Sequence, residues 1–383
     1  MALKVATRGQ IPSFIVMDVM RAANAKQRAG DKVLHMEVGQ PGTPAPLAVR
    51  QAAQAALEGD LLGYTDAFGL PALRQQLVGY YQATYGVALS ADSIAVTPGS
   101  SGSFLLAFLS AFNPGDRVAL AAPGYPAYRN ILTALGLEVV SLETDLAHRF
   151  QPTPELLAAA GALDGLIVAS PSNPTGTMLD AEALKALVGY CDAEGIRLIS
   201  DEIYHGIAYG ARAVSAAEFT DKAIIINSFS KYFSMTGWRL GWMVLPEDLV
   251  RPVECLAQNF FISASALSQH AAIAAFACQA ELDGYVTTYA HNRELLLREL
   301  PKAGFDRLAP ADGAFYLYAD VGHLTNDSVA FCQRMLRETS VATTPGTDFD
   351  PLRGNRTLRF SFAGPTSDMA EAVARLGDWL QKG

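Results

Sequence analysis

Short runs of consecutive apolar residues alternate with segments of helical periodicity through the middle of the chain. The apolar runs predict buried strands at residues 94–97, 117–121, 166–169, 197–200 and 223–226. Between them, helical spacing predicts helices over residues 101–112, 126–135 and 181–194. The last helix has Asp180 as its N-cap and ends at Gly195. Apolar strands that alternate with helices are typical of a mostly parallel sheet covered by helices on both faces.

The pattern changes after residue 240. Residues 240–245 are a candidate for an additional strand, and this strand could run antiparallel to its neighbours. A helical pattern rich in small residues covers residues 262–280 and predicts a long connecting helix. Beyond residue 281 strands become fewer, and amphipathic helices are predicted over residues 328–339 and 367–381.

Two domains follow from these patterns and from the length of the chain. A chain of 383 residues exceeds what one hydrophobic core usually serves. We expect an α/β fold whose large domain, residues 41–280, is built on a mostly parallel central sheet flanked by helices. Residues 1–40 and 281–383 are expected to form a smaller α+β domain.

Composition narrows the classes of function. Half of the residues are hydrophobic and 17% are charged, which suits a large buried core. A formal net charge of −9 and the lack of a long basic run argue against nucleic acid as a partner. No apolar run approaches the ~20 residues of a membrane helix, and the N-terminus lacks the apolar core of a signal peptide. The four cysteines match no metal-binding or CxxC spacing, so we expect no metal site and a cytoplasmic protein with reduced thiols.

Polar residues follow two of the predicted strands. The sequence Pro98-Gly99-Ser100-Ser101-Gly102 comes after the strand at 94–97 and begins a helix, so its hydroxyls and backbone N–H groups could bind an anion. Serine and glycine are also ordinary residues at the start of a helix. Asn173 follows the strand at 166–169, either as part of an Asn-Pro turn or as an amide held toward a ligand.

Two further strands end in charged residues. Asp201 follows the strand at 197–200, where a buried carboxylate is costly unless it is paired, either with a salt-bridge partner or with a protonated heterocyclic nitrogen. Lys231 lies just after the strand at 223–226, among serines, with Arg239 downstream. A lysine beside hydroxyls and a cation that can hold a phosphate is suited to Schiff-base chemistry.

The order and spacing of five polar residues resemble those of the fold-type-I pyridoxal-phosphate enzymes, specifically the class I aminotransferases. The five residues are Asn173, Asp201, Tyr204, Lys231 and Arg239. The resemblance runs from about residue 39 to residue 363. Matching segments outside the core set lie at residues 63–74, 123–128, 313–316 and 358–363.

The resemblance implies a role for each matching residue around the cofactor ring. Lys231 would form the internal aldimine and move the proton between the substrate Cα and the cofactor. Asp201 would keep the pyridine nitrogen protonated, so that the ring acts as an electron sink. Asn173 and Tyr204 would bind the phenolic oxygen of the ring, and Tyr125 would stack on its face.

The resemblance also implies a phosphate site and a substrate site. The phosphate would be held by Gly99, Ser100, Ser101, Ser228 and Arg239. In this family the tyrosine that matches Tyr64 reaches the phosphate of the other subunit, which implies a homodimer with shared active sites. The substrate α-carboxylate would be bound by Arg359, with Asn173 and Gly39 nearby.

Transamination is the reaction that the resemblance favours. An L-amino acid would pass its amino group to a 2-oxo acid by a ping-pong mechanism. The alternatives are a β-eliminating carbon–sulfur lyase on the same fold and, from another class, a non-catalytic pyridoxal-phosphate sensor fused to a DNA-binding module. The sensor is disfavoured by the acidic charge and by the short segment before the first matching motif.

The donor is expected to be a neutral or aromatic amino acid. In the aspartate-using members of the closest subgroup, a lysine after the Val-Thr-x-Gly turn helps to hold the distal carboxylate, and Ser101 stands at that position here. A dicarboxylate donor would need another cation. We expect structural roles for His205, Trp238, Trp242 and the cysteines.

Overall fold

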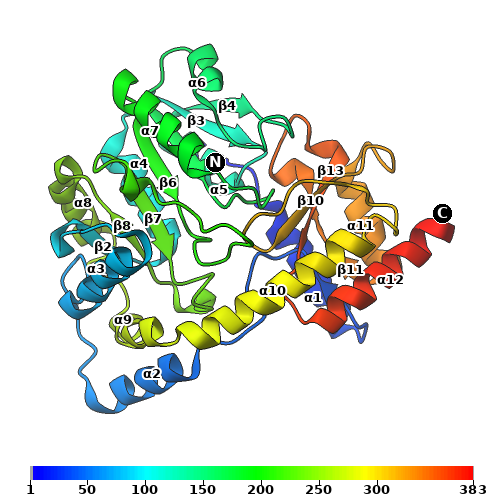
Figure 1. Ribbon diagram of the computed structural model, residues 1–383, viewed down its shortest axis with the longest axis horizontal. Coiled ribbons are helices and arrows are strands. Elements are labelled where there is room, and N and C mark those ends of the chain that lie inside the picture. The colour runs from blue at the N-terminus through cyan, green and yellow to red at the C-terminus, as the bar shows by residue number, and fades with distance from the viewer. Residues whose placement is uncertain (1–2, 383) are drawn as a thin grey trace.

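The computed structural model describes residues 3–382, and its larger part is built on a seven-stranded sheet in the order β2-β8-β7-β6-β5-β3-β4 (Figure 1). The five strands from β7 to β4 are parallel, and β8 is antiparallel to both β7 and β2. In sheet order, the strands are β2 (Ile94–Thr97), β8 (Gly241–Val244), β7 (Ile224–Ser228), β6 (Arg197–Asp201), β5 (Gly165–Ala169), β3 (Arg117–Ala122) and β4 (Glu138–Glu143).

Helices cover both faces of this sheet. Successive residues of β7 show why, because Ile225 belongs to one hydrophobic core whereas Ile224 and Ile226 belong to the core on the opposite face. The helices of this part are α2 (Leu47–Gly59), α3 (Pro71–Tyr85), α4 (Gly99–Ala111), α5 (Pro126–Leu135), α6 (Pro154–Ala160), α7 (Ala181–Glu194), α8 (Glu247–Phe260) and α9 (Ala266–Ile273).

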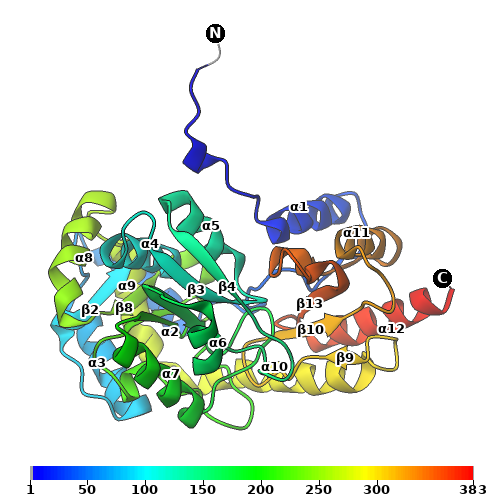
Figure 2. The ribbon, with the colours of Figure 1, turned by 90° about the horizontal axis from the view of Figure 1, so that it is seen from above.

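The smaller part holds a four-stranded antiparallel sheet in the order β12-β13-β10-β9 and a parallel pair of short strands, β1 and β11. The strands are β1 (Leu34–His35), β9 (Arg307–Leu308), β10 (Tyr316–Asp320), β11 (Val341–Ala342), β12 (Thr344–Pro345) and β13 (Thr357–Ser361). The helices are α1 (Ile15–Arg28), α10 (Gln279–Glu299), α11 (Ser328–Thr339) and α12 (Thr366–Lys382). The long helix α10 runs from the larger part along the smaller one (Figures 1 and 2).

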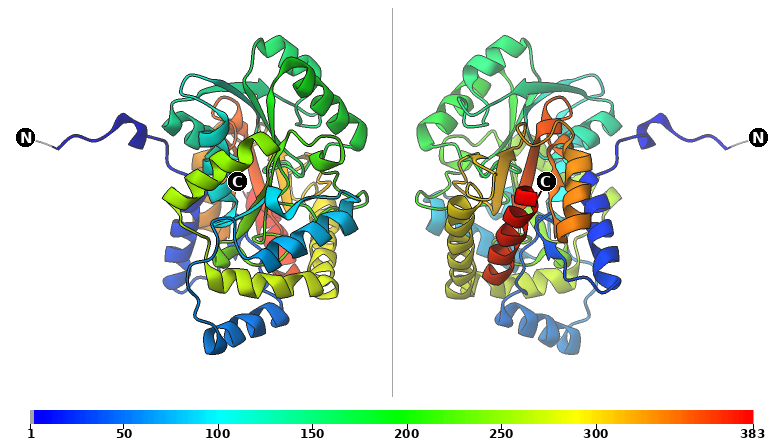
Figure 3. Two further views of the ribbon diagram at one scale, coloured as in Figure 1. Left: turned by 90° about the vertical axis from the view of Figure 1, so that its left-hand side faces the viewer. Right: turned by 90° about the vertical axis from the view of Figure 1, so that its right-hand side faces the viewer.

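Residues 3–13, which precede α1, are exposed and project from the body of the molecule (Figures 2 and 3). Within residues 3–382, no helix is both long enough and apolar enough to cross a membrane. Short 3-10 helices lie at Thr7–Gly9, Ala91–Ser93, Ala216–Glu218, Thr236–Trp238, Ala274–Ala277, Gly346–Asp348 and Gly354–Arg356.

The fold class predicted from the sequence is confirmed, including the antiparallel direction of the strand near residue 240. Asp180 caps α7 through its side chain, and Gly195 ends the helix in the left-handed conformation. The prediction of one helix over residues 262–280 is wrong, because the chain there forms α9, a 3-10 turn and the start of α10. Ser265 caps the start of α9, and the non-helical backbone of Cys278 separates the 3-10 turn from α10. The boundaries of the two domains stay a prediction.

Candidate active site

A cavity of about 190 Å³ lies where the carboxyl ends of the central strands meet the smaller sheet. In sheets of this kind, ligands bind beyond the carboxyl ends of the strands. The sequence-predicted residues that line the cavity are Gly39, Ser100, Ser101, Tyr125, Asn173, Asp201, Tyr204, Lys231, Arg239 and Arg359.

Three residues of the predicted set do not line this cavity. Gly99 lies directly behind the guanidinium of Arg239. Ser228 is buried and donates to the Ser230 hydroxyl at 2.9 Å, so that Ser230 takes its place at the cavity wall. Tyr64 is 84% exposed, on the segment between α2 and α3, where it would be free to contact a second copy of the chain.

Lys231 lies just beyond the end of β7, with its amine facing the cavity. The Nζ atom donates a hydrogen bond to the Gly39 carbonyl at 2.5 Å. Burial lowers the pKa of Lys231 to about 8, and the positive charges of Arg359 and Arg239 act in the same direction. At pH 7, about a tenth of this amine is therefore in the unprotonated, nucleophilic form, far more than for an ordinary lysine.

Asp201 ends β6, and its carboxylate is buried. It accepts hydrogen bonds from the Tyr128 hydroxyl and, at 3.1 Å, from the backbone N–H of Ile203. Burial raises the pKa of Asp201 to about 6, although these hydrogen bonds and the charge of Lys231 oppose the shift. Within residues 3–382, no cation forms an ion pair with Asp201. A protonated nitrogen of a ligand would suit this carboxylate.

Arg359, on β13, is a buried cation without a carboxylate partner among residues 3–382. Its Nη1 donates to Asn173 Oδ1 at 2.7 Å, its Nη2 donates to the Glu37 carbonyl, and its Nε has no partner. The guanidinium lies over the rings of Tyr316 and Phe349, 4.3 and 4.8 Å from their centroids. A buried cation with a free donor is suited to a carboxylate of the substrate.

Ser100 and Ser101 lie in the first turn of α4, beside the guanidinium of Arg239. Gly99 has a φ of 72°, and a Cβ there would lie 2.5 Å from Arg239 Nη2. A Cβ at Gly241 would likewise lie 2.8 Å from the backbone nitrogen of Ser100. The two glycines therefore let the backbone and Arg239 come close together at the start of the helix, as an anion site requires.

Three tyrosines complete the wall of the cavity. Burial raises the pKa of Tyr125 to about 12, so its hydroxyl stays protonated. The hydroxyls of Tyr204 and Tyr316 lie 2.6 Å apart. Together with Lys231, Asp201 and the anion site, these groups fit pyridoxal phosphate, which carries a phosphate, a protonatable ring nitrogen, a phenolic oxygen and an aldehyde.

Sequence analysis missed several residues of the cavity wall. Tyr128 lies one helical turn after Tyr125 on α5, and that spacing is a signal that could have found it. No local pattern marks the apolar side chains at the start of α1, which reach the cavity because Asp348 accepts the N–H groups of Ile15 and Val16, each at 3.1 Å. The missed residues are Phe14, Val16, Met17, Val38, Phe104, Ala127, Tyr128, Ile131, Ala169, Ile203, Ser230, Thr236 and Tyr316.

The structural roles expected for His205 and Trp242 agree with their surroundings. His205 is buried among protein groups and does not line the cavity, and Trp242 is fully buried in the core.

Replacing Tyr128 by phenylalanine should weaken the retention of pyridoxal phosphate by about 10-fold. The hydroxyl of Tyr128 stabilises the ionised form of Asp201, so its loss should raise the pKa of Asp201 further and weaken its hold on a cation. Equilibrium dialysis of the loaded enzyme measures the retention. Wild-type retention would mean that Tyr128 merely packs beside Asp201.

Comparisons with known proteins agree with this geometry. The family model for aminotransferase class I and II matches residues 31–376. The chain is 52% identical to a valine–pyruvate aminotransferase of Mycobacterium tuberculosis, over 98% of both chains. It is 33% identical to a (5-formylfuran-3-yl)methyl phosphate transaminase of Methanocaldococcus jannaschii, over 97% of both chains. The crystal structure of an aminotransferase from Mycobacterium tuberculosis superposes with a TM-score of 0.98 and 51% identity, over 100% of both chains.

Proposed function

The chain belongs to the class I and II aminotransferases, and from this premise we propose that its amino donor is a neutral, chiefly aliphatic amino acid. The protein is a pyridoxal-phosphate-dependent aminotransferase, which confirms the reaction type and the cofactor predicted from the sequence. The β-eliminating lyase is not favoured, because the relatives are aminotransferases.

One observation carries the choice of donor: a substantial part of the cavity wall is apolar. Phe14, Val16, Met17 and Ile131 contribute to this part. Among the described lining residues, the cations are Lys231, Arg239 and Arg359. Each of them already has another role in the proposed site, so none is free to bind a second carboxylate. A second carboxylate on the substrate would be left without a partner at considerable cost. The name of the valine–pyruvate relative supports an aliphatic donor.

We assign the chemistry as follows. Bound pyridoxal phosphate supplies an electron sink for the electron pair left behind when the substrate loses its Cα proton. Lys231 Nζ would accept that proton, since its lowered pKa makes the unprotonated amine far more abundant than in an ordinary lysine. Asp201 would hold the proton on the ring nitrogen, and Asn173 and Tyr204 would bind the phenolic oxygen.

The remaining residues would orient the two ligands. Ser100, Ser101 and Arg239 would bind the phosphate, with Gly99 permitting the close approach. Tyr125 would pack against the ring. Arg359 would bind the α-carboxylate, which the amino acid and the 2-oxo acid both carry, and this shared anchor suits a ping-pong reaction.

A donor panel tests the proposal. The loaded enzyme is assayed with valine, alanine, leucine, phenylalanine and aspartate, each with pyruvate and with 2-oxoglutarate as acceptor. We expect kcat/KM for the best neutral donor to exceed that for aspartate by about 100-fold. Ser101→Lys is the matched variant, and it should raise kcat/KM for aspartate relative to valine. Preference of the wild type for aspartate would overturn the proposed donor.

Replacing Arg359 by leucine should raise KM for the amino acid and for the 2-oxo acid alike, by about 100-fold or more. Both substrates would lose the same buried partner for their carboxylate. Arg359→Lys is the control, because it keeps the charge but loses the planar fork. An increase in KM confined to one side-chain class would instead make Arg359 a specificity residue.

We propose a homodimer with shared active sites. Leu61 and Tyr64 are 95% and 84% exposed, and the neighbouring Phe260 and Ile262 are about half exposed. Thr65 N–H donates to the Ser263 hydroxyl at 3.4 Å, so these two segments form one apolar surface. An exposed apolar surface of this kind is typical of an interface, and the resemblance of Tyr64 supports a second copy as the occupant.

Tyr64→Phe should weaken the retention of pyridoxal phosphate about 10-fold without dissociating the dimer, because it removes one donor and keeps the apolar ring. Sedimentation velocity and equilibrium dialysis of the same sample measure both properties. A fully active monomer would contradict the shared site.

The cysteines are free, which suits a reducing compartment, and we propose the cytoplasm as the location.

A further inference from the structure

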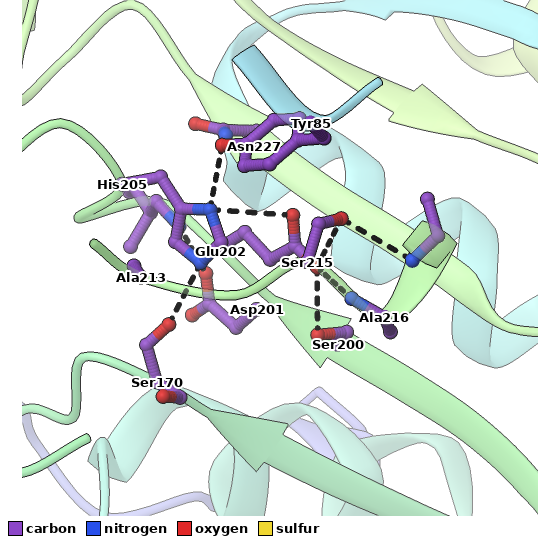
Figure 4. A network of polar contacts seen from close by, with 12 residues as sticks. Tyr85, Ser170, Ser200, Asp201, Glu202, His205, Ala213, Ser215, Ala216 and Asn227 are labelled. Carbon is purple, nitrogen blue, oxygen red and sulfur yellow. Dashed lines mark hydrogen bonds and ion pairs between the residues drawn. The ribbon is translucent and has the colours of Figure 1, made fainter. Parts of the chain in front are cut away.

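A buried polar network lies behind the site, beyond the wall that the mechanism uses (Figure 4). His205 follows Tyr204 directly and is 2% exposed. Its Nδ1 lies 2.7 Å from the Tyr85 hydroxyl, and its Nε2 lies 2.9 Å from the Ser170 carbonyl oxygen. None of these three residues lines the cavity, so the network does not touch the ligands directly.

The partners of the imidazole fix its tautomer. The Ser170 carbonyl can only accept a hydrogen bond, so Nε2 must carry the proton and donate it. Burial lowers the pKa of His205 to about 4, which leaves the ring neutral, and Nδ1 then accepts the hydrogen bond from Tyr85. Nε2 therefore has one defined partner, whereas Nδ1 faces the Tyr85 hydroxyl at 2.7 Å and, further away, Glu202 Oε2 at 3.5 Å.

Glu202 anchors the turn that carries His205. Its Oε1 accepts hydrogen bonds from the Ser200 hydroxyl at 3.1 Å, from the Ser215 hydroxyl at 3.0 Å and from the Ala216 N–H at 2.9 Å. The turn that carries His205 is thus anchored to its surroundings, and the imidazole projects from a fixed base.

The Ser170 carbonyl begins the turn that carries Asn173. Ser170 is also held through its N–H, which donates to the Asp201 carbonyl at 3.3 Å, and through its hydroxyl, which accepts from the Leu179 N–H at 3.0 Å. Three residues further on, Asn173 Oδ1 accepts the hydrogen bond from Arg359 Nη1. The position of Ser170 therefore affects the atom that orients the guanidinium.

We propose that His205 is a positioning residue for the substrate carboxylate. Its Nε2–H holds the Ser170 carbonyl, the turn then holds Asn173, and Asn173 holds Arg359 Nη1 in the direction in which the carboxylate binds. This inference rests on the carboxylate-binding role proposed above for Arg359.

Two amide substitutions separate the two hydrogen bonds of the ring. In His205→Gln the side-chain amide can reach the place of Nε2 and donate to Ser170, whereas in His205→Asn the shorter amide reaches only the place of Nδ1. Tyr85→Phe is the matched control, because it removes the other hydrogen bond of the same imidazole and leaves the Ser170 bond in place. A merely structural role of His205 would give His205→Asn and Tyr85→Phe the same phenotype.

The readouts are KM and kcat with valine and pyruvate, and the dissociation constant of 3-methylbutanoate from the loaded enzyme by calorimetry. This acid carries the carboxylate and the branched chain of valine but no amine, so it binds without reacting. We expect His205→Asn to raise KM and the dissociation constant about 10-fold, the effect of one lost buried hydrogen bond, with little change in kcat. We expect His205→Gln and Tyr85→Phe to stay close to wild type.

The inference is overturned if His205→Asn binds 3-methylbutanoate as wild type does, or if Tyr85→Phe weakens binding as much as His205→Asn. If His205→Asn does not fold, His205→Met fills the space without a donor and is subject to the same criteria. Arg359→Leu is measured alongside. If it weakens binding and His205→Asn does not, only the positioning role fails, whereas unchanged binding in Arg359→Leu removes the proposed carboxylate site itself.

Discussion

Replacing Lys231 by alanine should lower kcat by more than about 10⁴-fold, the upper part of the range for a positioned proton-transfer group. The amine of Lys231 is buried at the cavity wall, and burial with two neighbouring arginines lowers its pKa to about 8. Within the described residues that line the cavity, no other amine is present to form the covalent link or to take the Cα proton. Single-turnover conversion of valine to its 2-oxo acid measures the loss.

Lys231→Arg is the matched control for this prediction. It keeps a positive charge at the same place, but a guanidinium stays protonated and cannot act as the base. Both variants should therefore be inactive, while circular dichroism and melting temperature stay close to those of the wild type. Turnover within about 10-fold of wild type in either variant would remove Lys231 from the proton transfer.

Replacing Asp201 by asparagine should lower kcat by about 10³-fold and, at the same time, stabilise the protein without cofactor. The loss of activity follows because a neutral amide cannot hold the proton on the ring nitrogen. The gain in stability follows because burial raises the pKa of Asp201 to about 6, from its ordinary value of 3.8. An ionised carboxyl in this place therefore costs free energy of folding that asparagine does not.

The direction of the Asp201 pKa shift determines the pH range over which the stability of the protein changes. A raised pKa means that the favourable contribution of Asp201 is complete below about pH 4 and is lost as the pH rises to about 6. The melting temperature of the cofactor-free Asp201→Asn variant should therefore exceed that of the wild type by an amount that grows over this interval and then levels off. Thermal unfolding between pH 4 and pH 8 measures it. A wild type that gains stability relative to the variant as the pH rises would contradict the account.

The sequence was sufficient to predict the site residues that lie at the ends of strands. Asn173, Asp201 and Lys231 each follow an apolar strand, and adjacent parallel strands bring such residues to one edge of the sheet. The edge strand β4 was not predicted, because most of its residues are exposed or partly exposed and it lacks the fully apolar signature.

Other features depend on contacts between distant parts of the chain. The start of α1 reaches the cavity only because Asp348 binds its free N–H groups, and no pattern near residue 15 encodes that contact. Sequence analysis predicted Ser228, and not Ser230, for the phosphate site. Only packing decides that Ser228 faces the interior and Ser230 the cavity. The prediction of one helix over residues 262–280 was wrong because small residues continue the helical pattern across breaks that lie in the backbone.

A single-turnover experiment in two steps tests the central claim most directly. Loaded enzyme is mixed with excess valine and no 2-oxo acid, the products are quantified, and pyruvate is then added to the separated protein. Transamination from an aliphatic donor predicts one equivalent of 3-methyl-2-oxobutanoate per active site in the first step and one equivalent of alanine in the second. Absence of the oxo acid with valine, together with its stoichiometric formation from aspartate, would contradict the proposed donor, and continuous release of ammonia would contradict transamination.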